Sequence, residues 1–405
     1  MTLIIFLIGE AALSLGTTVR KNAVFETNQR KAYYIAEAGV ERALAYYPAL
    51  GSFPGINSLD YAGGVIESVY VKEVSTQYKI TSTGHYPKDG PVGIKATKKL
   101  EVIIQAIHYK GNAFSKILNV GAIPNVLAGV TAGKSWVKVD TEGKETNHYA
   151  EAEGIPLEVK LPGGNLLEGL LTVTSTGNEG KKTGGINPEN LPAVLQQLGL
   201  TVGALTAGAD SGTTPPRAES GSGIASLKLG PVLLFPEILE VSLIKTESSI
   251  KPDFASGTLV SSSGIAGDES VNIFLLGDTL KIEALQVKAI AEANGKPGEA
   301  KANFNWSVAD IILNYPIIGE KSILSDLKTQ GKVDLPGVLK ISLGPEQENT
   351  NPDGTYAKAS GSALMVELPG FLLGGVIIEI GNAEAEVKIP PGGLKPCKIA
   401  SWKEK

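Results

Sequence analysis

The residues of this sequence that could hold a metal ion or perform catalysis are few and widely separated. The three histidines, His85, His108 and His148, form no HExxH or HxH arrangement, so their spacing predicts neither a zinc site nor a histidine-based triad. The single cysteine, Cys397, excludes an internal disulfide, a CxxCH haem attachment and a cysteine-ligated cluster. No nucleophile elbow, Walker loop or GxGxxG stretch is present. We therefore expect neither a cofactor nor an enzymatic activity.

One short segment has the oxygen-ligand spacing of a calcium loop. In residues 349–354, NTNPDG, alternate side chains could point inward and the glycine could make the sharp turn. Ser360 occupies the place where such a loop needs a bidentate acid. A surface turn is therefore the favoured interpretation, and Asn349, Asn351 and Asp353 are the ligands of the alternative.

The element that dominates the sequence is an apolar N-terminal segment. Residues 1–19, MTLIIFLIGEAALSLGTTV, carry one ionisable side chain, Glu10. As a helix the stretch would be roughly 28 Å long, close to the hydrocarbon thickness of a bilayer. It lacks the basic start and the small-residue cleavage site of a secretory signal peptide. An acid in the middle of a membrane span is costly and usually indicates a partner.

The helical pattern continues beyond this segment. Apolar residues recur at helical spacing from Ala23 to Leu44, and nothing breaks the helix before Pro48. The sequence predicts one helix over residues 1–48, roughly 70 Å long. Its first half should be apolar on all sides and its second half amphipathic, which suits packing against a globular domain.

Three stretches resemble the type IV pilins, in particular the PilX-type pilins. Residues 1–4, MTLI, look like the start of a mature pilin. Residues 32–43, AYYIAEAGVERA, resemble the second helical segment, and residues 78–84, YKITSTG, with 100–104, LEVII, resemble the first strands. The resemblance covers about residues 1–108. It implies a subunit that polymerises through a parallel bundle of N-terminal helices.

The resemblance also implies which residues act in assembly, and it contains one departure. Most pilins carry glutamate at the fifth position, where it neutralises a neighbouring N-terminal amine, whereas this sequence has Ile5. Glu10 could act from a different register or pair with a basic residue of another stem. Small residues would let neighbouring stems approach closely. The expected assembly residues are Met1, Ile5, Phe6, Gly9, Glu10, Leu13 and Gly16.

The remaining sequence reads as β-rich. Residues 49–110 predict a small sheet on the helix, with strands at Val65–Val74 and Gln77–Thr83. Residues 111–209 form the first part of the head, 210–223 a linker or exposed loop, and 224–405 a β-rich C-terminal domain. With 48 glycines there are many turns between short strands. The expected class is α+β, a long N-terminal helix followed by a head of sandwich or hairpin-repeat type.

These features predict a structural subunit of an extracellular type IV pilus-like filament, with a membrane-embedded precursor stage. A net charge of -5 argues against a nucleic-acid partner. The expected partners are copies of the chain, the inner membrane before assembly and the pilus assembly machinery. The alternatives are a minor or tip pilin, a secretion-system pseudopilin, and a membrane-anchored surface adhesion or binding module.

Overall fold

The chain folds into two compact units. A computed structural model describes residues 2–47, 53–74, 77–89, 95–105, 108–121, 129–141, 150–161, 164–165, 172–177, 179–186, 200–213, 215–230, 239–275, 278–315, 319–368, 375–394 and 399–405. Residues 1–107 and 396–405 form the first unit, here the helix unit, and residues 108–395 form the second, here the sandwich unit. The sandwich unit is thus an insertion within the sequence of the helix unit.

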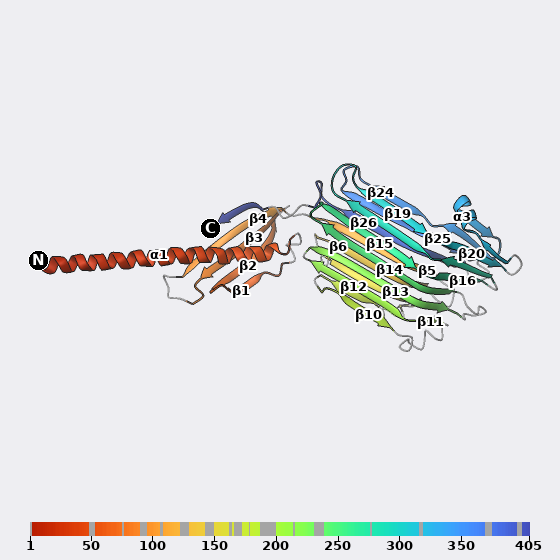
Figure 1. Ribbon diagram of the computed structural model, residues 1–405, viewed down its shortest axis with the longest axis horizontal. Helices are drawn as coiled ribbons and strands as arrows, with labels where there is room; N and C mark the ends of the chain where they lie inside the picture. Colours follow the sequence, from red (N-terminus) through yellow and green to blue (C-terminus); the bar gives the residue numbers. More distant parts are fainter. Residues whose placement is uncertain are drawn as a thin grey trace. The chain divides into compact units, whose positions relative to one another are not determined.

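The helix unit consists of one long helix on an antiparallel sheet (Figure 1). The helix, α1 (Thr2–Leu44), ends before the predicted residue 48, because residues 45–47 form a turn. The two predicted strands are confirmed. In spatial order the strands are β1 (Ile56–Tyr61), β2 (Gly64–Val74), β3 (Gln77–Tyr86), β4 (Ala96–Gln105) and β27 (Ile399–Glu404).

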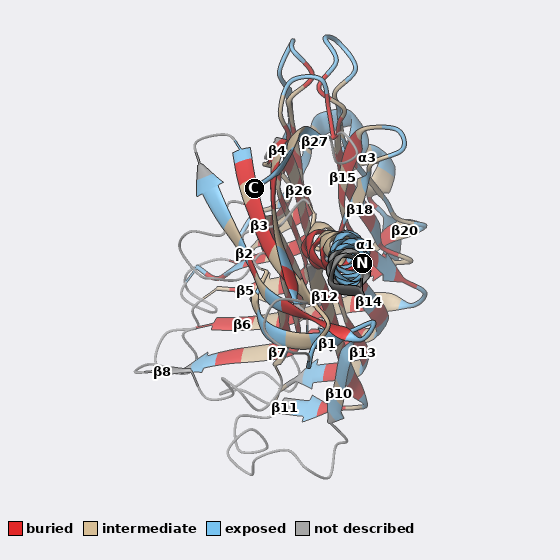
Figure 2. Ribbon diagram, turned by 90° about the vertical axis from the view of Figure 1, so that its left-hand side faces the viewer, coloured by how far each residue is buried: buried red, intermediate tan, exposed pale blue. Residues whose placement is uncertain are grey.

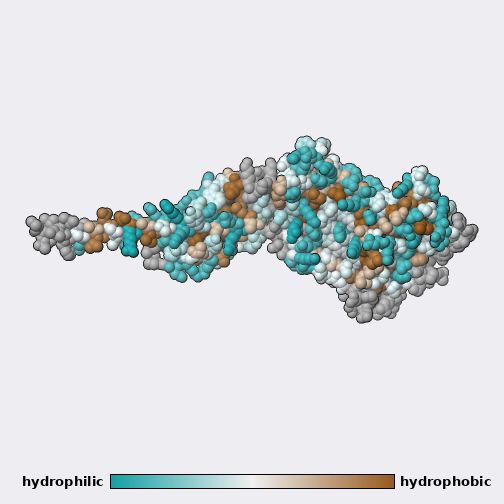
Figure 3. Space-filling view, viewed as in Figure 1, coloured by the Kyte–Doolittle hydropathy of each residue, from teal (hydrophilic) through white to brown (hydrophobic). Residues whose placement is uncertain are grey.

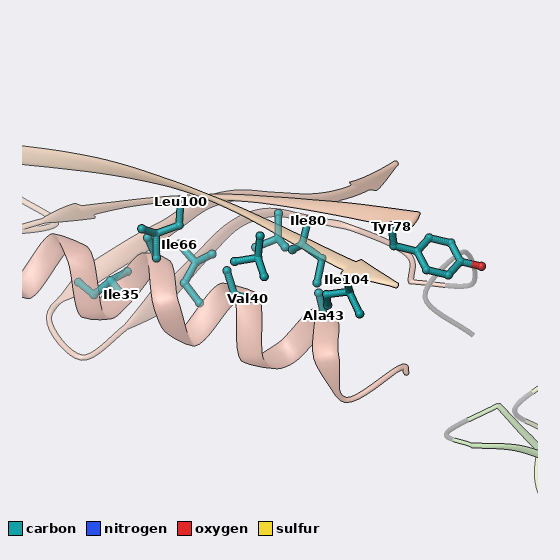
Figure 4. Close-up of a cluster of buried hydrophobic side chains, with 11 residues drawn as sticks. Ile35, Val40, Ala43, Ile66, Tyr78, Ile80, Leu100 and Ile104 are labelled. Carbon is teal, nitrogen blue, oxygen red and sulfur yellow. The ribbon is translucent and has the colours of Figure 1, made fainter. Parts of the chain in front are cut away.

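The C-terminal half of α1 packs into the core of this unit and supplies four of the eleven buried residues of its hydrophobic cluster (Figure 4). Its buried residues recur every three or four positions, which gives one apolar stripe facing the sheet. The stripe comprises Asn28, Ala32, Ile35, Ala36, Gly39, Val40 and Ala43, and it meets Ile66, Val69, Tyr78, Ile80, Leu100, Val102 and Ile104 of the strands. Two glycines permit this close approach. A Cβ at Gly84 would lie 2.5 Å from the Ala36 nitrogen, and one at Gly39 would lie 2.2 Å from Ser82 Oγ.

The last strand of the chain completes the sheet. β27 pairs antiparallel with β4, with Ile399 opposite Ile104. Trp402 Nε1 donates a hydrogen bond to the Tyr33 hydroxyl of α1 at 3.1 Å. The C-terminal residues therefore hold both the sheet edge and the helix, although they follow the whole sandwich unit in sequence.

The sandwich unit is built from two antiparallel sheets. Ten described strands form the β5 sheet: β22 (Lys332–Leu335), β23 (Leu339–Leu343), β24 (Glu346–Thr350), β25 (Tyr356–Glu367), β26 (Ile377–Lys388), β5 (Lys110–Val120), β6 (Gly129–Asp140), β7 (Ala150–Leu161), β8 (Gly164–Asn165) and β9 (Val173–Thr176).

Twelve described strands form the β14 sheet: β10 (Lys182–Ile186), β11 (Leu200–Val202), β12 (Leu205–Thr213), β13 (Pro216–Leu229), β14 (Leu239–Asp253), β15 (Thr258–Gly267), β16 (Ser270–Leu275), β17 (Asp278–Glu283), β18 (Gln286–Ala293), β19 (Lys301–Ser307), β20 (Asp310–Tyr315) and β21 (Gly319–Ser322). A short helix, α3 (Leu324–Gln330), follows β21.

Small side chains bring the two sheets unusually close. Ser135 Oγ on β6 lies 2.8 Å from Ser248 Oγ on β14, and Ser220 on β13 donates to the Trp136 carbonyl oxygen at 3.1 Å. A Cβ at Gly154 on β7 would lie 2.5 Å from the Gly221 carbonyl oxygen of β13. These buried serine hydroxyls form hydrogen bonds with groups of the opposite sheet. Their burial therefore costs little free energy of desolvation.

This interface corrects two expectations from the sequence. Residues 210–223 are not a linker, because their described residues lie in the paired strands β12 and β13, with Asp210 opposite Glu219. Their serines and glycines serve the close packing of the sheets. Residues 111–209 and 224–405 are likewise not separate parts, since strands from both contribute to the same sheets and residues 396–405 belong to the helix unit.

The predicted α+β class is wrong. The described structure is 66% strand and 14% helix, so the protein is mainly β with antiparallel sheets. The prediction gave too much weight to the N-terminal helix and read Ser- and Gly-rich strands as loops. α1 also differs from the expected apolar cylinder, because its exposed part carries Glu10, Arg20, Lys21 and Glu26.

Candidate functional site

The N-terminal half of α1 is not covered by the sheet of the helix unit. Every described side chain from Gly9 to Thr27 is exposed, and burial begins at Asn28. Figure 2 shows the described part of α1 nearest the viewer in the colour of exposed residues. Within this part Leu13 is 72%, Leu15 67% and Val19 60% exposed. Hydrophobic and hydrophilic residues lie side by side along it (Figure 3). A helix that is buried on one half and bare on the other is suited to binding a further partner along its bare half.

The predicted assembly residues fall on this bare half where the structure describes them. Gly9, Glu10, Leu13 and Gly16 are exposed, and a Cβ at either glycine would meet nothing within 4 Å. Ile5 and Phe6 lie in α1, but their side chains fall outside the described residues, as does Met1. Glycine weakens a helix by about 1 kcal/mol relative to alanine. The surface beside both glycines is open within the described chain.

Other exposed apolar residues of α1 were not among the predicted assembly residues. Leu15, Val19, Val24 and Phe25 extend the uncovered apolar surface toward the sheet. Their helical spacing with Leu13 was available in the sequence, but it resembled the pattern of the docked half. In the described part of the chain, no helix meets the length and hydropathy needed to cross a bilayer.

A polar cleft lies beside α1 where its bare half ends. It has a volume of about 420 Å³ and is lined by Glu26, Gln29, Arg30, Tyr33, Tyr34, Lys98 and Glu404. Lys98 and Glu404 form an ion pair that links β4 to β27. Tyr34 is 64% exposed, so its ring is available to a neighbour. The cleft therefore offers charged and aromatic contacts next to the apolar helix surface.

The chain was compared with known proteins in two ways. A scan against protein-family models finds no match for the chain, and a search of curated proteins finds none.

The outer face of the β14 sheet contains a broad groove of about 1110 Å³. Its floor is a row of small residues across adjacent strands. Gly208 lies opposite Gly221, Gly221 opposite Glu247, and Glu247 opposite Gly264. The backbone is therefore open to a ligand at three positions, and the charged Glu247 stands between them.

Polar side chains rise around this floor. They comprise Lys181, Asp210, Glu219, Lys245, Glu247, Ser249, Lys251, Ser262, Gln286, Lys288, Asn303 and Asn305. Lys251 pairs with Glu219 at 3.1 Å. Trp306 also lines the groove, but its indole N–H donates to Glu346 at 3.0 Å and the side chain is half-buried. The mixture of donors and acceptors suits a hydroxyl-rich ligand and disfavours a polyanion.

The calcium candidates lie in and after β24 and form no evident cluster. Asn349 pairs with Lys358 in the sheet, and the Asp353 carboxylate accepts two hydrogen bonds from Thr355 at 2.7 and 3.0 Å. Those bonds lower the pKa of Asp353. The described residues contain no group of three or more histidine, cysteine or acidic side chains placed to hold a metal ion. His148 lies outside the described residues.

A carboxylate on β4 fastens the C-terminus of the chain. Glu101 accepts hydrogen bonds from Lys405 at 2.8 Å and Lys79 at 3.1 Å. The Lys405 contact, followed by that of Lys79, holds the pKa of Glu101 below its usual value. A lowered pKa stabilises the fold above the unfolded-state pKa, and this stabilisation is lost as pH falls through the folded-state value.

We expect the amide protons of β27 to lose protection, relative to their intrinsic exchange rates, as the pH falls through the lowered pKa of Glu101 and its carboxylate becomes protonated. The Glu101→Gln variant should lose this pH dependence, because glutamine carries no charge at any pH. Hydrogen exchange at Trp402 and Lys405, followed by mass spectrometry between neutral and acidic pH, measures the effect. Identical acid sensitivity of β27 in the variant would contradict the assignment.

Proposed function

We propose that this protein is a structural subunit of an extracellular, type IV pilus-like filament. The observation that supports it best is the division of α1. One half is docked on the sheet through a regular stripe from Asn28 to Ala43, and the other half, from Gly9 to Thr27, is bare. The resemblance of residues 1–108 to type IV pilins supports the same arrangement.

The bare half gives a physical reason for polymerisation. Apolar surface exposed to water is unfavourable by roughly 25 cal/mol per Å², and a parallel bundle of such helices would cover it. A heterologous contact that repeats with a fixed rise and rotation does not close, so it produces an open helical filament. Gly9 and Gly16 would let neighbouring helices approach closely. Glu10 would have to be paired once buried, which fixes the stagger between subunits.

The proposal includes a stage before assembly and two further partners. The inner membrane would hold the N-terminal helix until neighbouring subunits cover it, and the pilus assembly machinery would transfer it. Copies of the chain are then the permanent partners. Minor or tip pilins and secretion-system pseudopilins use the same kind of helix, so they are the alternatives within this proposal.

Mass spectrometry of filaments sheared from cells tests the proposal. A structural subunit should be the most abundant protein of the sheared fraction. A trace amount would identify a minor or tip subunit. Complete retention with the membrane fraction would overturn the filament role and leave a pseudopilin or an anchored binding module.

The groove on the β14 sheet favours a second candidate function, which is a surface adhesion or binding module for hydroxyl-rich polymers. In this role Gly221 and Gly264 would receive a sugar ring, while Glu247 and Lys288 would contact its hydroxyls. Affinity electrophoresis of the full chain in gels containing neutral dextran or galactomannan tests it. Retardation that is lost in Glu247→Gln/Lys288→Met, but kept in the distant control Lys340→Met, would support it. Equal mobility with and without both polymers would overturn it.

A further inference from the structure

Three side chains that could react with one another meet on the outer face of the β5 sheet. Lys116 on β5 lies directly opposite Asn382 on the adjacent antiparallel strand β26. Glu379 lies three residues before Asn382 on β26. Strand β5 begins the described part of the sandwich unit, and β26 is the last strand in it. A bond between Lys116 and Asn382 would therefore join the first and last strands of this unit.

The Glu379 carboxylate bridges the other two side chains. Its Oε2 accepts a hydrogen bond from Lys116 Nζ at 3.2 Å, and its Oε1 accepts one from Asn382 Nδ2 at 2.9 Å. The buried Ser362 on β25 donates to Glu379 Oε1 at 2.6 Å and accepts from Asn382 Nδ2 at 3.1 Å. These contacts hold an amine, a carboxyl group and a carboxamide in one chain of hydrogen bonds.

The site is shielded more than an ordinary surface ion pair. The Lys116 side chain is 15% exposed and that of Glu379 is 24% exposed. The Phe114 ring lies with its centroid 5.7 Å from Lys116 Nζ. Burial raises the pKa of Glu379, but hydrogen bonds from Ser362, Lys116 and Asn382, together with the Lys116 charge, hold it below its usual value. The carboxylate form of Glu379 is therefore favoured, which leaves it able to accept a proton from Lys116.

We propose that Lys116 and Asn382 condense to an intramolecular amide cross-link, with Glu379 as the group that carries the proton. This proposal concerns the maturation of the sandwich unit and stands independently of the filament role. Lysine becomes a nucleophile once it is neutral, and the required acid–base group lies within hydrogen-bond reach of both reacting groups.

The reaction balances without an oxidant or a further reagent. Lys116 Nζ transfers a proton to Glu379 Oε2, and its lone pair then attacks Cγ of Asn382 to form a C–N bond. Glu379 returns the proton to Nδ2, and Nδ2 takes a second proton from Nζ as the Cγ–Nδ2 bond breaks. The products are a secondary amide and an ammonium ion. Glu379 ends in its starting protonation state.

Such a bond would close the chain between residues 116 and 382. A cross-link stabilises chiefly by restricting the unfolded chain, and a long closed loop gives a large effect. It would also hold together the two adjacent strands through which the sandwich unit connects to the rest of the chain. A subunit pulled through these connections would transmit force through a covalent bond instead of strand pairing.

Intact-mass spectrometry of the purified full chain tests the proposal. After prolonged incubation at neutral pH the protein should weigh about 17 Da less than its sequence, because one ammonia is lost. Tryptic digestion should then yield one branched peptide that contains Lys116 and Asn382, with no cleavage after Lys116. A full sequence mass after this incubation would overturn the proposal.

Variants separate the cross-link from other losses of ammonia. Lys116→Arg keeps the ion pair with Glu379 but cannot condense, so it should have the full sequence mass, and Glu379→Gln should too. The matched control Lys358→Arg alters another pair across β25 and β26, with Glu384 at 2.9 Å, and should keep the mass deficit. A deficit that persists in Lys116→Arg would indicate cyclisation of Asn382 alone and would overturn the proposal.

Discussion

Filament formation should be lost when Leu13 and Leu15 are both replaced by aspartate. Both leucines are about two-thirds or more exposed in the single chain, at 72% and 67%. Burying each leucine in a helix bundle would contribute roughly 1.5–3 kcal/mol, and an unpaired buried aspartate opposes burial further. A loss of about 4 kcal/mol at each contact between neighbouring subunits lowers the affinity of that contact on the order of 1,000-fold. Electron microscopy and pelleting of the sheared fraction measure the loss.

The same substitutions should leave the isolated subunit intact, because neither leucine contributes to its core. The thermal unfolding of the purified variant should match that of the parent chain. Leu243→Asp is a suitable control, since Leu243 is 48% exposed on the sandwich unit and has a φ of 42°, which aspartate tolerates. Normal filaments in the Leu13→Asp/Leu15→Asp variant would contradict the bundle.

The second large effect should come from Gly84→Ala in the helix unit. The new Cβ would lie 2.5 Å from the Ala36 nitrogen and 2.8 Å from the Ala32 carbonyl oxygen. Both are backbone atoms of α1, so the helix itself would have to move away from β3. Overpacking of this kind costs about 1–3 kcal/mol. We expect the unfolding temperature of the helix unit to fall by on the order of 10 °C.

Gly16→Ala is the matched control for this prediction. A Cβ at Gly16 meets nothing within 4 Å, so the subunit should keep or slightly raise its helix stability. Calorimetry, together with hydrogen exchange in β3, distinguishes the two variants. An unfolding temperature for Gly84→Ala equal to that of Gly16→Ala would show that the helix is not docked as described.

The sequence predicted those helices and strands that are determined by residues close together in the chain. The helical spacing from Ala23 to Leu44 follows from one amphipathic face, and the strands Gly64–Val74 and Gln77–Tyr86 follow from β-branched residues between turns. The end of the helix was placed four residues too late, because Pro48 was read as the first breaker. A turn at residues 45–47 precedes it.

Non-local pairing explains what the sequence did not predict. Residues 210–223 have the composition of a loop, and only the proximity of the opposite sheet gives their serines and glycines a role in strands. The return of β27 to β4 depends on residues nearly the whole chain apart. The candidate site shows the same division. Glu10 and the glycines of α1 were found from one segment, whereas the Lys116–Glu379–Asn382 cluster needed the register of β5 against β26.

The position of β27 has a consequence for how the protein is made. Its six residues leave the ribosome after the whole sandwich unit, yet they complete a sheet whose other four strands precede that unit. At roughly 5–20 residues per second, β4 waits on the order of tens of seconds for its partner. During translation β4 is an open sheet edge, which invites pairing with other chains. A chain terminated before β27 would keep that edge open permanently. Such an incomplete subunit would differ from the finished one by an unpaired β4 edge.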